Sequence, residues 1–264
     1  TDGTTDKCVG HGIDHGASTS DSNRTQSNHV AAQVSATSAS LVKYGDFNSW
    51  ITDGVRIDWT INSGTIALEI VCVLFGGDDL DAHVGKVDVA NGTAVTGVGF
   101  KPDLGFFICS GLADNAGETS YAIMSFGCAT RGDADAVTQS SLCRYDRDSQ
   151  PTTDVGGCVT PDAVASQFIH SGLTWESGIS SWDADGFTTS ATSTNSDDFS
   201  YLVLNLGGAT ATLLDDFNTG TSTGTKAYTT DAKPQAIIGC MSAWESNDES
   251  GNNVGKGEPL ALFA

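Results

Sequence analysis

The sequence predicts an all-β protein built as two tandem-duplicated antiparallel β-sandwich lobes, jelly-roll-like and related by pseudo-twofold symmetry. Three observations favour this class. Short apolar or alternating runs are separated by turn residues, in a chain that holds 31 Gly and only 5 Pro. Helical periodicity is weak throughout. The phrase Ser49–Gly54 returns as Ser181–Gly186 at an offset of 132 residues (185 − 53), which is half of the 264-residue chain.

Three further landmarks keep nearly the same offset. Gly76-Gly77 returns as Gly207-Gly208, Lys101-Pro102 returns as Lys233-Pro234, and Cys109 returns as Cys240. Several markers in one register predict a repeat, and a repeat sets the whole fold. We expect one lobe in residues 1–126 and the other in residues 127–264. Because residues 121–132 resemble the last residues of the chain followed by the first, the two ends are expected to complete one lobe together.

Each lobe is expected to contain about eight strands. Strand patterns occupy residues 66–75, 82–89, 104–109, 121–129, 186–192, 199–206, 209–217, 236–241 and 259–263. The run Leu104–Cys109 is apolar on both faces and follows Lys101-Pro102. We therefore expect a central strand that begins just after the proline. Its counterpart, Ala236–Cys240, is expected to be central in the second lobe.

The remaining segments are rich in turn-forming residues. Residues 1–29, 110–120, 130–160 and 244–258 predict loops, and loops are the surfaces that most often face partners. Residues 161–168 fit either a helix or a strand. The pair Asp-Gly in each copy of the repeated phrase predicts a turn between two strands.

The chain is strongly acidic, with a net charge of −21. Its acids are 27 Asp and 6 Glu, and three interpretations stay open: Asp-rich turns, adaptation to high salt, and multivalent cation binding. All three argue against a nucleic-acid partner, because phosphate attraction requires a basic face. No run of 18 apolar residues occurs, so we expect no membrane span. The first residue is not Met, which indicates a processed or trimmed N-terminus.

Seven cysteines leave at least one thiol unpaired within a single chain. Cys72, Cys109 and Cys240 lie in apolar runs and are expected to be small buried hydrophobes. Cys143 and Cys158 flank a polar segment and are the candidates for a local disulfide. No C-x-x-C spacing occurs, which argues against a zinc ribbon or a redox pair.

One acidic cluster is the main metal candidate. Asp78, Asp79, Asp81 and His83 follow Gly76-Gly77, and three of them share one face of an extended strand. The alternative is a solvated turn, since the second copy has Ala209–Thr212 instead. Two weaker candidates are Asp183–Gly186, which resembles the opening of a calcium loop, and the H-x-x-D-H run His11–His15, whose alternative is a flexible glycine-flanked loop. We expect no cofactor other than a structural Ca²⁺ ion.

Catalytic patterns are missing from the sequence. No G-x-S-x-G elbow occurs, and Gly97-Val98-Gly99 precedes Phe-Lys-Pro instead of a helix, so it is no dinucleotide loop. We expect the protein not to be an enzyme. Trp50 and Trp182 occupy equivalent repeat positions, which predicts a packing role for both. Trp244, after the second apolar strand, is the candidate for an exposed aromatic contact.

Three phrases carry a resemblance. Phe75–Gly85 (FGGDDLDAHVG), Val95–Leu104 (VTGVGFKPDL) and Ser181–Thr188 (SWDADGFT) resemble segments of tandem-repeat structural proteins from tailed bacteriophages and haloarchaeal tailed viruses. The resemblance covers roughly residues 45–130 and 175–244. The second copy departs from the pattern at Gly207–Thr210, so a site shared by both copies is not expected there.

The resemblance implies a non-enzymatic virion protein: a capsid decoration, turret or tail-associated module that binds other virion subunits and forms a homo-oligomer. It implies a virion or extracellular location, and the acidic composition fits a salt-loving host. A receptor-binding or lectin-like module that binds a host-surface glycan is the alternative. A secreted polysaccharide-active enzyme is the third hypothesis.

Overall fold

The structure, a computed structural model, describes residues 1–14, 21–35, 40–62, 72–118, 121–149, 155–169, 171–213, 227, 230, 238–241 and 261–263. Apart from one short 3-10 helix, every element in these ranges is a strand, which confirms the all-β prediction. In chain order the elements are β1 Cys8–Asp14, β2 Asp21–Ser27, β3 Ala31–Val34, β4 Leu41–Ile51, β5 Gly54–Asn62, β6 Asp81–Asp88, β7 Ala94–Val95, β8 Leu104–Leu112, β9 Gly117–Glu118, β10 Tyr121–Arg131, η1 Asp133–Asp135, β11 Val137–Arg147, β12 Val155–Thr160, β13 Ala165–Ile169, β14 Gly172–Asp183, β15 Gly186–Ala191, β16 Asp198–Asn205, β17 Gly239–Met241 and β18 Ala261–Phe263. Within these ranges, no helix has the length and apolar character needed to cross a bilayer.

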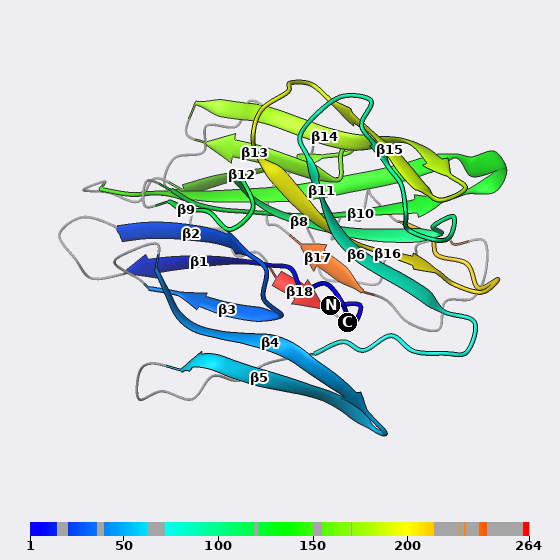
Figure 1. Cartoon of the computed structure of the whole chain (residues 1–264). Coiled ribbons are helices and arrows are strands. Elements are labelled where there is room, and N and C mark those ends of the chain that lie inside the picture. The colour runs from blue at the N-terminus through cyan, green and yellow to red at the C-terminus, as the bar shows by residue number, and fades with distance from the viewer. Residues whose placement is uncertain are drawn as a thin grey trace.

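Two antiparallel sheets form the larger part of the molecule. A six-stranded sheet has the order β12-β11-β10-β8-β16-β6, and a four-stranded sheet has the order β13-β14-β15-β7. Figure 1 shows the six-stranded sheet in the middle, with β13, β14 and β15 above it and β1 to β5 below it. The strand β8 lies between β10 and β16, so the prediction of a central strand directly after Lys101-Pro102 is confirmed.

The main hydrophobic core lies between these two sheets. Its buried residues are Val87, Val89, Val95, Val98, Phe107, Cys109, Ala129, Val164, Ala165, Trp175, Ile179, Trp182, Phe187, Phe199, Tyr201 and Val203. Phe107 of β8 is at its centre, with its ring edge-on to the rings of Phe187 and Phe199 at centroid distances of 6.0 Å. Edge-to-face contacts of this kind add to the stabilisation from burial alone.

Two hairpins of the chain have the same register. In β4–β5, Trp50 pairs with Val55 and a bulge lies between Phe47 and Ser49. In β14–β15, the residues at an offset of 132 (182 − 50) behave identically: Trp182 pairs with Phe187 and the register shifts between Ile179 and Ser181. A bulge re-aims the side chains that follow it. Both hairpins therefore present the same set of positions on each face.

The repeated Asp-Gly forms a hairpin turn, as the sequence predicts. In the second copy, the aspartate of this turn also binds a neighbouring loop. Asp185 accepts hydrogen bonds from the backbone N–H of Gly97 at 2.9 Å and of Gly99 at 2.6 Å. These two bonds lower the pKa of the Asp185 carboxyl. The turn thereby holds the glycine loop that precedes Lys101-Pro102, which connects two of the landmark phrases physically.

The prediction of a loop over residues 1–29 is wrong, because β1 and β2 pair along their whole lengths. The strand β2 has no apolar residue, yet Ser22 to Ser27 are buried. It packs on β8 and β10. Its hydrogen bonds reach β8 and β16: Arg24 Nη1 donates to Ser110 O at 2.8 Å, and Gln26 Nε2 donates to Asp198 O at 3.2 Å. A polar strand that is buried by hydrogen bonding carries no hydrophobic periodicity.

Other predicted boundaries change as well. Residues 130–160 are not a loop, since β11 and β12 lie there, and residues 161–168 lead into a strand and not a helix. Residues 72–75 and 209–213 form no strand, although both were expected to end or begin one. The flexible loop expected at the H-x-x-D-H run is a strand as far as it is described, with His11 opposite Arg24.

The predicted division at residue 126 falls within β10, and the six-stranded sheet combines strands from both halves. Of the expected central strand at 236–240, only residues 238–240 lie in the described ranges, and β17 pairs there with β18. The separation of the chain into two lobes stays a prediction.

Candidate binding surface

The β4–β5 hairpin has an apolar face that is partly open to solvent. Its register places Phe47, Trp50, Val55, Ile57 and Trp59 on one side, and we call these five residues the apolar hairpin face. Trp50 is 53 % exposed and Trp59 is 40 % exposed. Large exposed apolar groups that cluster together indicate a surface for a partner.

The equivalent face of β14–β15 has the opposite environment. At an offset of 132 residues (182 − 50), Trp182 is only 3 % exposed and lies in the main core with Ile179 and Phe187. The predicted packing role is therefore confirmed for Trp182. For Trp50 it holds only in part, because its ring packs on Phe47 at a centroid distance of 4.9 Å while half of its surface stays exposed.

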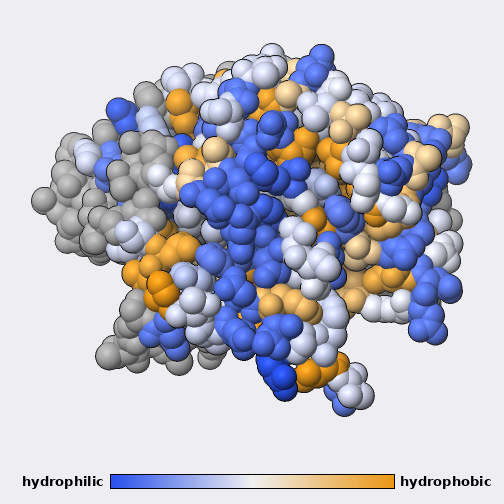
Figure 2. All heavy atoms as spheres, in the orientation of Figure 1, coloured by the Kyte–Doolittle hydropathy of each residue, from blue (hydrophilic) through white to orange (hydrophobic). Residues whose placement is uncertain are grey.

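The hairpin end extends this surface. Ile51, next to Trp50 in the turn, is 49 % exposed. Figure 2 shows hydrophobic atoms at the lower tip of the molecule, where Figure 1 places the end of the β4–β5 hairpin. A second exposed apolar run, Val73 to Phe75, leads towards β6. Exposed apolar side chains thus gather around the part of the molecule below the six-stranded sheet.

The opposite face of the β4–β5 hairpin is polar and contains a histidine–aspartate pair. His29 Nδ1 lies 2.6 Å from Asp46 Oδ1, and its ring stacks on Tyr44 at 3.9 Å. Thr60 Oγ1 donates to the other Asp46 oxygen at 3.2 Å. An aspartate that orients an imidazole also occurs in hydrolases, but there a nucleophile meets the second ring nitrogen. The described ring contacts of His29 are Asp46 and Tyr44, so the arrangement supports a hydrogen-bonded pair that stabilises the hairpin.

The residues of the predicted metal cluster lie in a turn and in the strand that follows it. Asp78 and Asp79 lie in an exposed turn before β6. Asp79 packs on Gly207, where an added Cβ would lie 2.5 Å from Asp79 O. Gly207 also has a φ of +59°, so both the contact with Asp79 and the backbone conformation favour a glycine at this position.

Asp81 and His83 have different protein partners. Asp81 Oδ2 accepts a hydrogen bond from Asn205 Nδ2 at 3.1 Å, whereas His83 Nδ1 lies 4.0 Å from Asp2 Oδ2 and its ring faces Tyr201. Over the described ranges, no three His, Cys, Asp or Glu side chains are grouped so that they could hold a metal ion. The metal interpretation of Asp78, Asp79, Asp81 and His83 stays a prediction.

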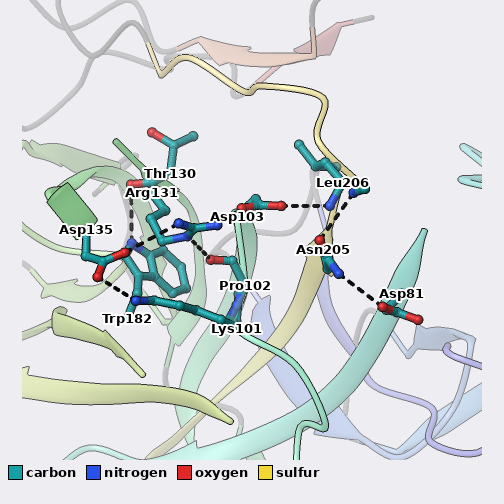
Figure 3. A network of polar contacts seen from close by, with 11 residues as sticks. Asp81, Lys101, Pro102, Asp103, Thr130, Arg131, Asp135, Trp182, Asn205 and Leu206 are labelled. Atoms are coloured by element: carbon teal, nitrogen blue, oxygen red, sulfur yellow. Dashed lines mark hydrogen bonds and ion pairs between the residues drawn. The ribbon is translucent and has the colours of Figure 1, made fainter. Parts of the chain in front are cut away.

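A polar network fixes the start of the central strand (Figure 3). Asp103 contacts the Arg131 guanidinium and accepts the backbone N–H of Leu206 at 2.9 Å. Arg131 Nε donates to Pro102 O at 3.0 Å. The network joins β10 and the residue after β16 to the residues that lead into β8. The Asp103 carboxylate and the Arg131 guanidinium therefore serve to hold these strands together.

The same network includes a surface ion pair. Lys101 Nζ lies 2.5 Å from Asp135 Oδ2, and Arg131 Nη1 lies 3.4 Å from Asp135 Oδ1. The hydrogen bond from Lys101 lowers the pKa of the exposed Asp135 carboxyl. The lysine of the repeated Lys-Pro phrase therefore acts here as a partner of the β10–β11 turn, and the contacts give it no role in binding an anion.

Two aspartates face each other across β6 and β16. Asp88 and Asp198 are direct cross-strand partners, and Lys86 Nζ donates to Asp198 Oδ2 at 2.9 Å. The hydrogen bond between the two carboxyl groups raises the pKa of Asp88. Burial of Asp198 opposes ionisation, but the bonds from Asp88, Lys86 and the Asp114 N–H outweigh it and lower the pKa of Asp198. Asp198 thus holds the charge, and Asp88 is the group that favours a proton.

Replacement of Asp88 by Asn is expected to stabilise the protein at neutral pH by roughly a few tenths of a kcal/mol, because it removes a like charge opposite Asp198. The raised pKa of Asp88 means that its favourable contribution is present in acid and is lost as pH rises through its folded pKa. The gain should therefore disappear below about pH 4. Urea denaturation at several pH values measures it.

Asp81→Asn is the matched control, because Asp81 lies on the same strand but opposite an asparagine, Asn205. It should give no gain at neutral pH. If both variants changed the free energy of unfolding equally at every pH, the Asp88 and Asp198 carboxylates would not repel each other measurably.

Trp244 lies outside the described residues, so its exposure stays a prediction. The sequence missed the exposed surface because Trp50 and Trp182 stand in the same phrase. It also missed the His29–Asp46 pair, since these residues are far apart in the sequence and the pairing of β3 with β4 brings them together.

Comparison of the chain with protein-family models, with curated proteins and with solved structures gives no match.

Proposed function

We propose that this protein is a non-enzymatic structural component of a virion, a capsid decoration, turret or tail-associated module that acts through protein–protein contacts. The apolar hairpin face is the observation that carries the proposal. Two tryptophans with large exposed areas are costly on a free protein surface, and they are among the residues that contribute most to interfaces. The resemblance of the repeated phrases to tailed-virus structural proteins supports the same class.

We also propose that the chain is a tandem duplication of a β-sandwich of jelly-roll type. The two hairpins support this with their common register and bulge, and β17–β18 pairs antiparallel as β8–β10 does. Of the five positions equivalent to the apolar hairpin face, Ile179, Trp182 and Phe187 lie in the main core and Ala191 packs against it. The fifth, Thr189, is fully buried. By this comparison, the apolar hairpin face of β4–β5 corresponds to a face that is buried in β14–β15.

A second copy of the chain is the occupant we propose for the apolar hairpin face. An apolar face is complementary in chemistry to itself, as a twofold contact requires. Each copy carries a net charge of −21, so two copies repel each other at low ionic strength. Salt screens this repulsion and leaves the apolar contact intact. Association should therefore become stronger as the salt concentration rises.

The test is sedimentation velocity of the purified chain from low to high salt. We expect wild type to shift towards a dimer with increasing salt, and Trp50→Ser with Trp59→Ser to weaken the dimer about 30-fold or more. Thr60→Ser, an exposed and uncharged change on the polar side of β5, is the matched control and should leave association unchanged. A wild-type protein that stays monomeric at every salt concentration would contradict self-association.

The virion assignment has its own test. Mass spectrometry of purified particles should detect the chain, and deletion of its gene should reduce particle assembly or stability. Detection of the chain only as a free secreted protein would overturn the assignment.

A lectin-like, receptor-binding function is the second candidate, favoured by the same two exposed tryptophans, because indole rings stack on sugars. A glycan array distinguishes the two functions. Binding that is lost in Trp50→Ser would support the lectin, whereas a negative array together with a salt-promoted dimer supports the structural function.

A further inference from the structure

The two cysteines that flank the β11–β12 connection are opposite each other in the sheet. Cys143 of β11 and Cys158 of β12 are direct cross-strand partners in an antiparallel pair. Partners of this kind point to the same face, with Cα atoms about 4.5 to 5.5 Å apart. That separation lies inside the range found in disulfides, about 4.4 to 6.8 Å.

Both thiols lie in one small apolar cluster. Cys143 is 3 % exposed and Cys158 is 2 % exposed, and they pack with Ile123, Tyr145 and Phe168. Cys143 Sγ accepts a hydrogen bond from the Phe168 N–H at 3.3 Å, and Cys158 Sγ lies 4.0 Å from Ser166 Oγ. Burial raises the pKa of Cys143, and contact with the Cys158 thiol raises it further. Both cysteines are free thiols in this structure.

We propose that Cys143 and Cys158 are a disulfide site, which is oxidised while the chain folds and then enclosed by the second hydrophobic cluster. The oxidant is a low-molecular-weight disulfide. One cysteine thiolate attacks the oxidant and releases one small thiol, and the second cysteine attacks the mixed disulfide and releases the other. Two protein thiols are oxidised to one disulfide, and one small disulfide is reduced to two small thiols.

The timing follows from the burial of the pair. Only thiolates react. Once the cluster has closed, burial shields both thiols from the oxidant, and the raised pKa of Cys143 keeps that residue protonated. The two residues belong to adjacent strands, so they can meet before the rest of the core forms. After closure, the same burial protects the disulfide from reduction.

The other described cysteines that lie in strands have no such partner. Cys8 is opposite Ser27, Cys109 is opposite Ser125, Cys128 is opposite Phe106 and Ser140, and Cys240 is opposite Leu262. Among the described strand pairs, Cys143 with Cys158 is the one pair of facing cysteines. The pairing should therefore be specific and not a mixture.

The test is refolding of the reduced, unfolded full chain with and without a mixture of oxidised and reduced glutathione. Digestion without reduction, followed by mass spectrometry, should identify a peptide that joins Cys143 to Cys158. The oxidised protein should melt roughly 5 to 10 °C above the reduced protein. This gain should be absent in the double variant Cys143→Ser, Cys158→Ser and retained in the control Cys128→Ser.

The peptide map is made on the wild-type chain, so it gives an answer even if the double variant does not fold. Recovery of residues 143 and 158 as free thiols after oxidative refolding would overturn the proposal. Disulfides that join either residue to another cysteine would overturn it as well.

Discussion

Trp182→Ala is expected to lower the free energy of unfolding by about 3 to 5 kcal/mol. Trp182 is 3 % exposed in the main core, its ring lies edge-on to Phe187 at 6.2 Å, and its Nε1 donates to Thr130 O at 3.4 Å. The alanine variant loses the buried ring area, leaves a cavity between the two sheets, and removes the partner of a buried carbonyl. Denaturant unfolding followed by far-UV circular dichroism measures the change.

Trp50→Ala is the matched control, since the same residue type occupies the equivalent hairpin position with 53 % exposure. It should change the stability of the monomer by less than about 1 kcal/mol, because surface positions contribute little. If the two alanine variants destabilised the monomer equally, the apolar hairpin face would be covered within a single chain, and the proposed contact with a second copy would be wrong.

Gly127→Ala is expected to cost about 3 kcal/mol or more. A Cβ at residue 127 would lie 1.8 Å from Val164 O and 2.5 Å from Val164 C. These are backbone atoms, and Val164 is itself fixed by the bond from its N–H to Ser177 O at 2.8 Å. The added methyl group cannot be accommodated by a side-chain rotation, so β10 and β13 must move apart along the main core. Thermal unfolding of the purified variant, or its failure to fold, provides the measurement.

Gly132→Ala, five residues further along the chain, separates steric exclusion from the general effect of replacing a glycine. Its Cβ would meet Ala136 at 3.7 Å, which is ordinary contact, and its φ of −91° suits alanine. We expect this variant to be as stable as wild type or slightly more stable. A Gly127→Ala protein that was as stable as Gly132→Ala would show that the two sheets are not in contact at this point.

Those parts of the fold that carry an apolar pattern or a proline could be predicted from the sequence. Lys101-Pro102 followed by Leu104 to Cys109 predicts a central strand, and β8 is central because apolar side chains on both faces require cover on both faces. The Asp-Gly turns were equally predictable from their flanking strands. What the sequence could not show is which of the two equivalent hairpins packs on the main core, since that depends on long-range packing.

The candidate surface was harder to predict than the fold. Trp50 and Trp182 stand in the same local phrase, and no local property distinguishes an exposed tryptophan from a buried one. The strand β2 was missed for a related reason: its burial depends on partners such as Ser110 and Asp198, which are far away in the sequence. For the acidic cluster after Gly76-Gly77, proximity in sequence did not fix the partners: Asp81 bonds to Asn205, whereas His83 lies near Asp2, and the metal hypothesis stays a prediction.

The buried polar strand β2 has a consequence for how the molecule comes apart. Separation of β2 from the six-stranded sheet would expose hydrogen-bonding groups of a strand that has no apolar side chain, so this step should have a small change in heat capacity. Its free energy depends on directional bonds such as those of Arg24 and Gln26, which allow one alignment and no sliding. The position of β2 against the large sheet is therefore set by matched hydrogen-bond donors and acceptors. In the main core, by contrast, stabilisation comes mainly from the burial of apolar area, which does not depend on such directional bonds.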